Sequence, residues 1–414
     1  MTKKRVVITG LGAITPVGNN VQDTWAALLS GKSGIGLISR FDASTLPTHI
    51  AAEVKDFNPA DHFDHKEIKK LDLYTQFALV AAREAVQDAA LEPGSYNPDR
   101  VGVITGVGIG GILTFEEETI KCHTQGPRRI SPFFIPKMIA NISAAHIAIE
   151  QGFKGINFNI TSACASANHA IGTAFRTIQY GDADIIVSGG AEAAVTPLAV
   201  GGFSAMRALS TRNDDPTTSS RPFDKERDGF VMAEGAAFII LEELEHAKAR
   251  GARIYAEIAG YGATDDAYHI TAPTEDGEGS ARAIQMAIND AGLKPEDIDY
   301  VNAHGTSTPL NDKGETASIK KVFGEHAYKL KVNSTKSMVG HMLGAAAGIE
   351  AIVCAKSLDE GVVHPTINLV NPDPDCDLDY NTGSSCKLDI RTALSNSLGF
   401  GGHNSAVVFK KYQA

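Results

Sequence analysis

The sequence of 414 residues predicts an α/β fold built from two pseudo-symmetric halves. Strands and helices alternate along the chain, which favours largely parallel strands joined by right-handed crossovers. The order β-α-β-α-β-α-β-β occurs twice, and in each half a short strand leads into a helix of small residues. We therefore expect one half over residues 1–251 and the other over 252–414, joined near 249–253.

The first half begins with a strand over residues 5–12, where Val and Ile alternate with glycines, and a helix over 21–29. A long amphipathic helix is expected over 73–91, because its apolar residues recur at helical spacing. The elements expected after it are a strand over 101–107 that closes on glycines, a helix over 138–150, a strand over 156–160, a small-residue helix to about residue 180, and strands over 184–189 and 236–241.

The second half repeats this order. Its helix over 280–293 ends in Asp-Ala-Gly-Leu, which matches the Asp-Ala-Ala-Leu at 88–91 in the first half. The other elements expected are strands over 253–262, 300–303 and 330–334, a small-residue helix over 344–358, and closing strands over 394–398 and 405–409.

The composition is that of an ordinary globular protein, with 43% hydrophobic and 21% charged residues. No run reaches the roughly 18 uncharged apolar residues of a membrane helix, and the basic start lacks a secretory apolar region, so we expect a cytoplasmic protein. The net charge of -11 argues against binding to nucleic acid or anionic membranes. The five cysteines lack CxxC spacing, which suggests reduced thiols and neither a disulfide framework nor a zinc site.

One of these cysteines, Cys164, lies in Asn-Ile-Thr-Ser-Ala-Cys-Ala-Ser at residues 159–166, between a strand and a helix. The unpaired N–H groups and the dipole at a helix N-terminus favour negative charge, and therefore a thiolate. This placement predicts a nucleophile. The alternative is a small buried apolar residue, which is the usual role of a free cysteine.

Three loops follow strands in equivalent places, and they carry Cys164, His304, and the pair Lys336 and His341. Loops at the carboxyl ends of parallel strands face one pocket. A thiol opposite two neutral imidazoles suits acyl transfer with stabilisation of an enolate, whereas a Cys/His hydrolase needs only one His and an orienting carboxylate or amide. The glycine-rich loop around Phe400 either presents backbone N–H groups to a carbonyl or is a plain turn between strands.

Four motifs then carry a family resemblance: Thr-Ser-Ala-Cys-Ala-Ser-Ala at 161–167, Asn-Ala-His-Gly-Thr-Ser-Thr-Pro-Leu-Asn-Asp at 302–312, Lys-Ser-Met-Val-Gly-His-Met-Leu-Gly-Ala at 336–345 and Asn-Ser-Leu-Gly-Phe-Gly-Gly-His-Asn at 396–404. Together they resemble the β-ketoacyl-acyl carrier protein synthases over essentially the whole chain, and the sequence is most similar to the synthase II branch. The resemblance implies a thiolase-like five-layered αβαβα fold, a homodimer and a Cys-His-His centre.

The resemblance also implies a reaction: decarboxylative Claisen condensation of an acyl-acyl carrier protein with malonyl-acyl carrier protein, giving a 3-oxoacyl product in fatty acid elongation. Cys164 would carry the acyl group as a thioester, and His304 and His341 would hold the malonyl thioester and its enolate. The backbone N–H groups of Cys164 and Phe400 would form the oxyanion hole. No cofactor is expected beyond the phosphopantetheine of the carrier.

Other residues receive supporting roles from the resemblance. Lys336 and Glu350 would order the histidine loop, or would form an ordinary buried pair. Substrate-binding residues would be Thr306, Thr308, Ile109, Phe203, Phe400 and Phe134, the last reaching in from a partner subunit. Residues that dock the acidic carrier would be Lys66, Lys69, Lys70, Arg128, Arg129 and Arg207, although a run of lysines is also typical of a solvated face. Some relatives hold a monovalent cation near Asn302, Glu350 and Asn396, but no metal is expected here.

Three alternatives stay open. A non-catalytic partner subunit of a polyketide system would keep the fold, but such subunits typically lack the cysteine. An acyltransferase or thioester hydrolase would use Cys164 without decarboxylating malonate, and His341 argues against it. Synthase I or a freestanding polyketide ketosynthase would have the same three residues, and pocket volume would separate them.

Overall fold

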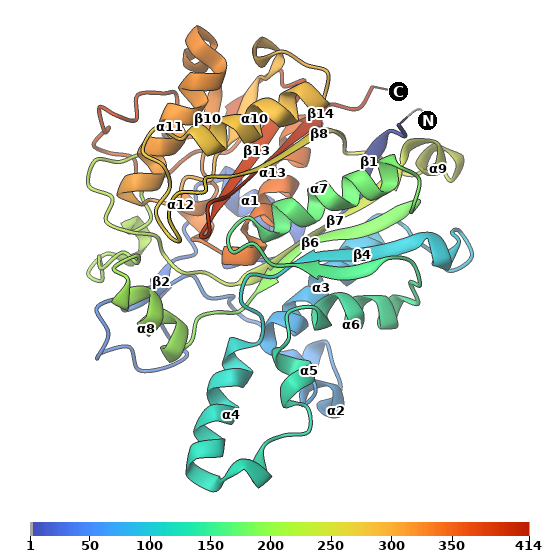
Figure 1. Cartoon of the computed structure of the whole chain (residues 1–414), viewed down its shortest axis with the longest axis vertical. Coiled ribbons are helices and arrows are strands. Elements are labelled where there is room, and N and C mark those ends of the chain that lie inside the picture. Colours follow the sequence, from blue (N-terminus) through green and yellow to red (C-terminus); the bar gives the residue numbers. More distant parts are fainter. Residues whose placement is uncertain (1–2, 414) are drawn as a thin grey trace.

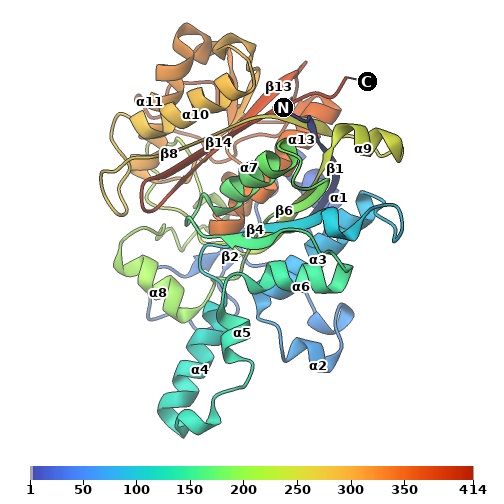
Figure 2. The same cartoon turned by 45° about the vertical axis from the view of Figure 1, so that its right-hand side comes forward.

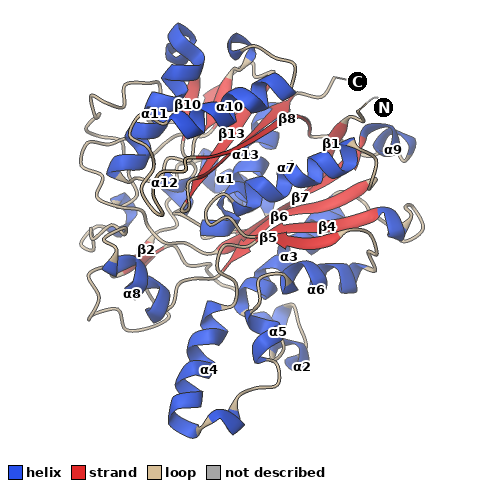
Figure 3. Cartoon of the chain, viewed as in Figure 1, coloured by secondary structure: helices blue, strands red, loops and turns tan. Residues whose placement is uncertain are grey.

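The computed structural model describes residues 3–413. Within that range the centre of the molecule is a ten-stranded mixed sheet with the order β10-β9-β13-β14-β8-β1-β7-β6-β4-β5. Figure 3 shows its strands in red: β1 (Val6–Ile14), β4 (Val101–Gly106), β5 (Asn157–Ile160), β6 (Ile185–Glu192), β7 (Gly235–Glu243), β8 (Ala256–Asp265), β9 (Tyr300–Asn302), β10 (Lys331–Asn333), β13 (Thr392–Gly399) and β14 (His403–Lys410).

The sheet consists of two five-stranded halves with the same internal order. Read outward from the middle, the first half runs β1-β7-β6-β4-β5 and the second runs β8-β14-β13-β9-β10, so each strand has a counterpart at the same position. The halves meet where β1 pairs antiparallel with β8, from Val6 opposite Ile258 to Ile8 opposite Ala256. The duplicated pattern predicted from the sequence is therefore confirmed, while the boundary between residues 251 and 252 stays a prediction.

Helices complete five layers, as Figures 1 and 2 show. α3 and α6 cover the outer face of the first half-sheet, α10 covers that of the second with α11 packed beside it, and α7 and α13 lie between the two. The helices are α1 (Val21–Leu29), α2 (His65–Ile68), α3 (Leu73–Asp88), α4 (Ile112–Gln125), α5 (Phe134–Met138), α6 (Ile142–Gln151), α7 (Ser166–Gln179), α8 (Pro197–Ala205), α9 (Leu244–Ala249), α10 (Glu278–Asp290), α11 (Pro309–Phe323), α12 (Lys336–Val339) and α13 (Ala346–Glu360).

Two short antiparallel pairs lie outside the main sheet. They are β2 (Gly36–Leu37) with β3 (Ile50–Ala51), and β11 (Val362–Val363) with β12 (Cys386–Lys387). α4 and α5 project from the body beside α2, at the bottom of Figure 1. We call residues 112–138 the α4–α5 arm. Among residues 3–413, no helix combines the length and the apolar character that crossing a membrane requires.

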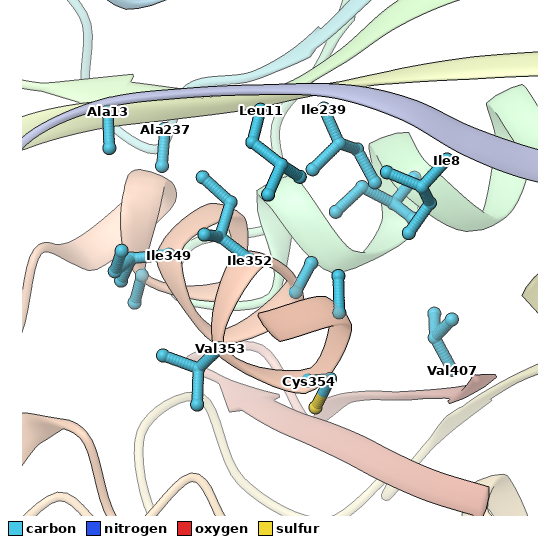
Figure 4. Close-up of a cluster of buried hydrophobic side chains, with 14 of the residues drawn as sticks. Ile8, Leu11, Ala13, Ala237, Ile239, Ile349, Ile352, Val353, Cys354 and Val407 are labelled. Atoms are coloured by element: carbon cyan, nitrogen blue, oxygen red, sulfur yellow. The ribbon is translucent and has the colours of Figure 1, made fainter. Parts of the chain in front are cut away.

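The position of α13 between the two half-sheets explains why this helix is rich in small residues. α13 is buried nearly all round, and its first turns read Ala346, Ala347 and Gly348 before Ile349. A helix that is apolar on every side belongs in the interior of a protein. In Figure 4, Ile349 and Ile352 of α13 pack below Leu11 of β1 and Ile239 of β7. One continuous core therefore joins the two halves.

The predicted elements agree with the structure within a few residues at most boundaries, and the helix over 21–29 coincides with α1. The helix predicted over 138–150 is instead the end of α5 followed by α6, because Ile139 is extended and interrupts the helical path. The sequence predicted no helix at the position of α11. Its buried face carries polar residues such as Asp312, Glu315 and Thr316, so it lacks the apolar spacing that marks a helix in sequence.

The packing of α13 can be tested at Ile352, whose side chain is 2% exposed. We expect Ile352→Ala to lower the free energy of unfolding by about 2–5 kcal/mol and Ile352→Val by about 0.5–1.5 kcal/mol, because a larger deletion leaves a larger cavity. Denaturant unfolding measures both. Met286→Ala on the exposed face of α10 serves as control, and equal stability of the Ile352→Ala and control variants would contradict this packing.

Candidate active site

The loops that follow β5, β9, β10 and β13 meet around one cavity of about 370 Å³. Cys164, His304, His341 and Phe400 all line it. They come from distant parts of the chain and from both halves. The structure therefore brings together the residues that the sequence placed at equivalent strand ends.

Cys164 occupies a sharp turn between β5 and α7. The preceding residue, Ala163, has φ of 50°, a left-handed conformation that is uncommon for a residue with a side chain. The Ser166 hydroxyl holds the turn, since it accepts a hydrogen bond from Ser162 N at 2.9 Å and donates to Ala163 O at 2.6 Å. This bend presents the thiol to the cavity.

The expectation that the helix N-terminus makes Cys164 a thiolate is wrong for the protein without substrate. Burial raises the pKa of the Cys164 thiol to about 12. The charge of Lys336 and the backbone N–H groups of Cys164 and Phe400 lower this pKa, but burial outweighs them. The thiol is protonated at neutral pH, and the same two N–H groups lie where they can stabilise negative charge once it forms.

Both histidines are neutral hydrogen-bond donors toward the cavity. Burial and the charge of Lys336 lower the pKa of His304 and of His341 well below the usual value. His304 Nδ1 lies 3.2 Å from Lys336 Nζ, and His341 Nδ1 accepts from Leu343 N at 3.3 Å. Because Nδ1 is the acceptor in each ring, Nε2 carries the proton.

The two rings lie close together at nearly a right angle. Their centroids are 5.3 Å apart and their planes cross at 87°. The centroid of the Phe230 ring lies 5.2 Å from that of His341 with the rings edge to face, and the backbone N–H of His341 donates to Val231 O at 2.7 Å. Two N–H donors are thus held in fixed positions, as stabilisation of a developing oxyanion requires.

Buried charged groups hold the histidine loops from behind. Lys336 and Glu350 are each 1% exposed, and the Lys336 ammonium donates to Glu350 as well as to His304. Glu315 of α11 accepts from His304 N at 2.6 Å and from Gly305 N at 2.7 Å. Burial raises the pKa of Glu315 and of Glu350 to about 7.

Some of the residues expected to bind substrate line this cavity. Thr306 and Thr308 do, with their hydroxyl oxygens 2.9 Å apart, and so does Phe203, whose ring centroid is 6.4 Å from that of Phe400. Ile109 and Phe134 do not line the cavity within this chain.

Phe134 instead lies on the α4–α5 arm with its ring 6.5 Å from that of Phe115. The neighbouring apolar side chains of the arm are exposed, Ile120 by 57% and Ile135 by 55%. An apolar surface of this kind is typical of a protein interface. The assignment of Ile109 and Phe134 to an acyl pocket stays a prediction.

The six basic residues expected to dock a carrier are all exposed, and none of them forms an ion pair within residues 3–413. Arg207 lines the cavity, whereas the others lie apart from it. Lys66 lies on α2 and Lys69 caps it, Lys70 follows with its ammonium 5.9 Å from the Phe133 ring, and Arg128 and Arg129 form the turn after α4.

Several residues of the site could not be identified from the sequence. Phe230 lines the cavity but lies in a loop without a recognisable motif. Glu315 carried no signal because its helix buries a polar face. Glu192, at the end of β6, accepts hydrogen bonds from the N–H groups of Gly108, Ile109, Gly110 and Gly344 and so ties the two halves together beside Cys164.

The described residues include no cluster of three or more His, Cys, Asp or Glu side chains that could hold a metal ion. Several buried oxygens nevertheless lack a hydrogen-bond partner, among them Asn302 Oδ1, Glu350 Oε2 and Asn396 Oδ1. The family resemblance implies a possible monovalent cation near these three residues, and oxygen ligands fit such an ion. If it binds, these three residues would hold it, and it would fix the Glu350 side chain. The absence of a metal stays a prediction.

Comparison with known proteins gives matches along nearly the whole chain. The family described as "Beta-ketoacyl synthase, N-terminal domain" matches residues 3–247, and "Beta-ketoacyl synthase, C-terminal domain" matches 255–370. A 3-oxoacyl-[acyl-carrier-protein] synthase 2 of Synechocystis sp. is 54% identical over 413 residues, which cover 100% of this chain and 99% of the relative. The enzyme of the same name from Staphylococcus aureus is 54% identical over 411 residues, 99% of each chain.

Solved structures agree with this. A type II polyketide ketosynthase, solved in complex with its acyl carrier protein, is 39% identical with a TM-score of 0.93, and the match covers 99% of this chain and 100% of the other. A β-ketoacyl synthase from Burkholderia phymatum is 36% identical with a TM-score of 0.92, at the same coverage.

The buried pair of Lys336 and Glu350 gives a test of the site's electrostatics. Lys336→Met alone leaves a buried carboxylate without its counter-charge, and we expect a loss of about 3–5 kcal/mol in the free energy of unfolding. Adding Glu350→Leu removes that carboxylate, so the double variant should be more stable than Lys336→Met. Urea unfolding of both variants measures the difference, and a double variant no more stable than Lys336→Met would contradict this coupling.

Proposed function

Because the chain belongs to the β-ketoacyl synthase family, we propose that it condenses an acyl thioester with a malonyl thioester, both carried on acyl carrier protein. The products are a 3-oxoacyl thioester two carbons longer, carbon dioxide and free carrier. The observation that supports this most is a thiol that shares one cavity with two neutral imidazoles, each presenting Nε2–H.

The first half-reaction transfers the acyl group to Cys164. The sulfur attacks the acyl thioester carbonyl, the bond to the carrier sulfur breaks, and the proton of the Cys164 thiol balances the released carrier thiol. The N–H groups of Cys164 and Phe400 would stabilise the tetrahedral oxyanion, since both already lie within reach of the sulfur. Lys336 adds a positive charge that favours the thiolate at the moment of attack.

The second half-reaction forms the carbon–carbon bond. The malonyl thioester loses its carboxylate as CO2, and the electron pair of the broken bond forms an enolate whose oxygen accepts from His304 and His341 Nε2–H. The enolate carbon attacks the acyl carbonyl on Cys164, and the thiolate leaves. These donors are in place before the charge develops, so they need not reorganise during the reaction. This preorganisation lowers the free energy of the transition state.

The partner is acyl carrier protein, and the solved neighbour with a bound carrier supports this. An acidic carrier would meet Arg207 beside the cavity and the basic residues of α2 and of the α4–α5 arm. We also propose a homodimer. β5 is the outermost strand of its half, the arm exposes apolar side chains, and Phe134 needs a second subunit to reach an acyl pocket.

The curated relatives favour synthase II of fatty acid elongation over the alternatives, because those at 54% identity carry that name. The polyketide ketosynthase at 39% identity keeps the freestanding polyketide enzyme as the second candidate. A non-catalytic subunit fits poorly, since Cys164 is present and lines the cavity. A cytoplasmic location and the lack of a cofactor stay proposals.

Intact-protein mass spectrometry tests the mechanism. After mixing with a C12 to C16 acyl-carrier protein, the wild type should gain one acyl mass and then lose it on addition of malonyl-carrier protein, as a product lengthened by two carbons. Cys164→Ala should stay unmodified. His341→Ala should still take up the acyl group but elongate it about 100- to 1000-fold more slowly, since it lacks one of two oxyanion donors. Release of the acyl group as free acid would disprove the enolate step.

Carrier docking is tested by charge reversal at Arg128 and Arg129. We expect Arg128→Glu with Arg129→Glu to raise KM for the carrier-linked substrate about tenfold, which corresponds to about 1.4 kcal/mol, and to spare an acyl-CoA substrate that has no carrier surface. The variant Lys294→Glu with Lys329→Glu, which reverses the charge of two other exposed residues, provides the control. Equal losses with both substrates would count against docking at this surface.

A further inference from the structure

The proposed oxyanion hole is formed by two segments from different halves of the molecule. One donor is the N–H of Cys164, on the turn before α7, and the other is the N–H of Phe400, between β13 and β14. We infer that His169 holds these two segments at their working distance and is a positioning residue for acyl transfer to Cys164. This inference rests on the proposed function and adds a residue that touches neither the thiol nor the cavity.

His169 lies in the first turn of α7, and its ring contacts the cysteine turn directly. Its Nδ1 is 2.6 Å from the hydroxyl oxygen of Ser162, which precedes Cys164 by two residues and is 6% exposed. Ser162 N is itself fixed by Ser166, so the turn has little freedom to rotate away from the ring. The imidazole therefore acts on the position of the Cys164 N–H through one short hydrogen bond.

The same ring contacts β14 on the other side of the site. The centroid of the His169 ring lies 6.2 Å from that of the His403 ring on β14, with the planes at 84°, and the backbone of the next residue, Asn404, raises the pKa of His169. Burial is the larger effect and lowers this pKa, which keeps the ring neutral. A neutral imidazole has one donor and one acceptor nitrogen, and Nδ1 lies within hydrogen-bond distance of the Ser162 hydroxyl. One ring thus contacts both segments, Ser162 through a hydrogen bond and β14 through packing against His403.

The glycine loop itself rests against these groups. A Cβ added to Gly399 would lie 2.7 Å from Ser162 O and 3.2 Å from Cys164 N, so the loop backs directly onto the cysteine turn. A Cβ on Gly401, whose φ is 95°, would lie 2.9 Å from His403 Nε2. The His403 ring is in turn 6.2 Å from the ring of His169, edge to face. The loop that carries Phe400 is therefore located by contacts with the turn and with this histidine pair.

The groups that face the His169 ring are few. Besides Ser162 and Asn404 they are His403, whose Nδ1 lies 3.8 Å from Asp265, and Tyr261, whose ring centroid is 6.4 Å away. The next residue toward the N-terminus, Asn168, donates to Ser405 O at 3.2 Å and also joins α7 to β14. The first turn of α7 is thus attached to β14 at two adjacent positions, but only His169 also reaches the cysteine turn.

The decarboxylation site is held by other contacts. His304 is fixed by Lys336 and Glu315, and His341 by Leu343 and Val231. None of these bonds involves His169. Loss of the His169 ring should therefore impair the half-reaction that needs the N–H pair of Cys164 and Phe400, and should spare the half-reaction that needs the two imidazoles. General unfolding or loosening would impair both.

The experiment compares the two half-reactions in wild type and His169→Ala. Acyl transfer is followed as the rate of Cys164 acylation from acyl-carrier protein, and decarboxylation as conversion of malonyl-carrier protein to acetyl-carrier protein and CO2. We expect acylation to slow about 10- to 100-fold, somewhat less than for complete loss of an oxyanion donor. Decarboxylation should stay within about twofold of wild type, because its donors are unchanged.

Further variants secure the result. His169→Gln keeps a side-chain amide that can hydrogen-bond to the Ser162 hydroxyl and should recover part of the acylation rate. Ser162→Ala breaks the same link from the other end and provides the test if His169→Ala does not fold. His326→Ala, which removes a ring that holds the Ile298 carbonyl at 2.8 Å far from the cavity, should leave both rates unchanged.

Two outcomes would overturn the inference: an equal fall in both half-reactions of His169→Ala, or normal acylation in both His169→Ala and Ser162→Ala. Failure of the proposed function would be seen separately, since the wild type itself would then neither take up an acyl group nor release CO2 from malonyl-carrier protein.

Discussion

Two half-sheets share one pair of helices, and this constraint shapes the rest of the molecule. α7 and α13 touch a sheet on both sides, so most of their residues are buried, and α13 is built almost wholly from small and apolar residues. Ala346, Ala347 and Gly348 at the start of α13 let the layers approach closely. Because both helices begin at the carboxyl ends of strands, their N-terminal turns meet at one place. The cavity with Cys164 and the two histidines forms there.

Burial controls the charge state of this cavity. It raises the pKa of Cys164 and Glu350 and lowers that of His304 and His341, so each of these groups is shifted toward its neutral form. The Lys336 ammonium, bonded to Glu350 and His304, also favours a thiolate on Cys164. The site is thus set to meet negative charge that arises during reaction, which is how preorganised donors accelerate acyl transfer.

The same kind of turn occurs in both halves and has a different role in each. Ala163 before Cys164 and Leu343 before Gly344 occupy equivalent positions, and both have left-handed φ, 50° and 46°. In the first half this turn leaves the Cys164 N–H near the sulfur, available to a substrate oxyanion. In the second half the N–H of Gly344 is occupied by the carboxylate of Glu192. Duplication supplied two similar N–H sites, of which one faces the reaction and the other fastens the halves together.

The sequence by itself determined the order of elements, the duplication and the four loops that carry the chemistry, because strand and helix periodicity and short motifs are local properties. It also brought Cys164, His304 and His341 to one site, since equivalent strand ends in a duplicated α/β fold face a common pocket. It did not reveal α11, whose buried face is polar, or the roles of Glu315, Phe230 and His169, which arise from contacts between residues far apart in the chain. It also misjudged the cysteine: a helix N-terminus suggested a thiolate, and only the tertiary structure showed that burial outweighs it. Desolvation depends on everything packed around a group, and that packing exists only once the chain has folded.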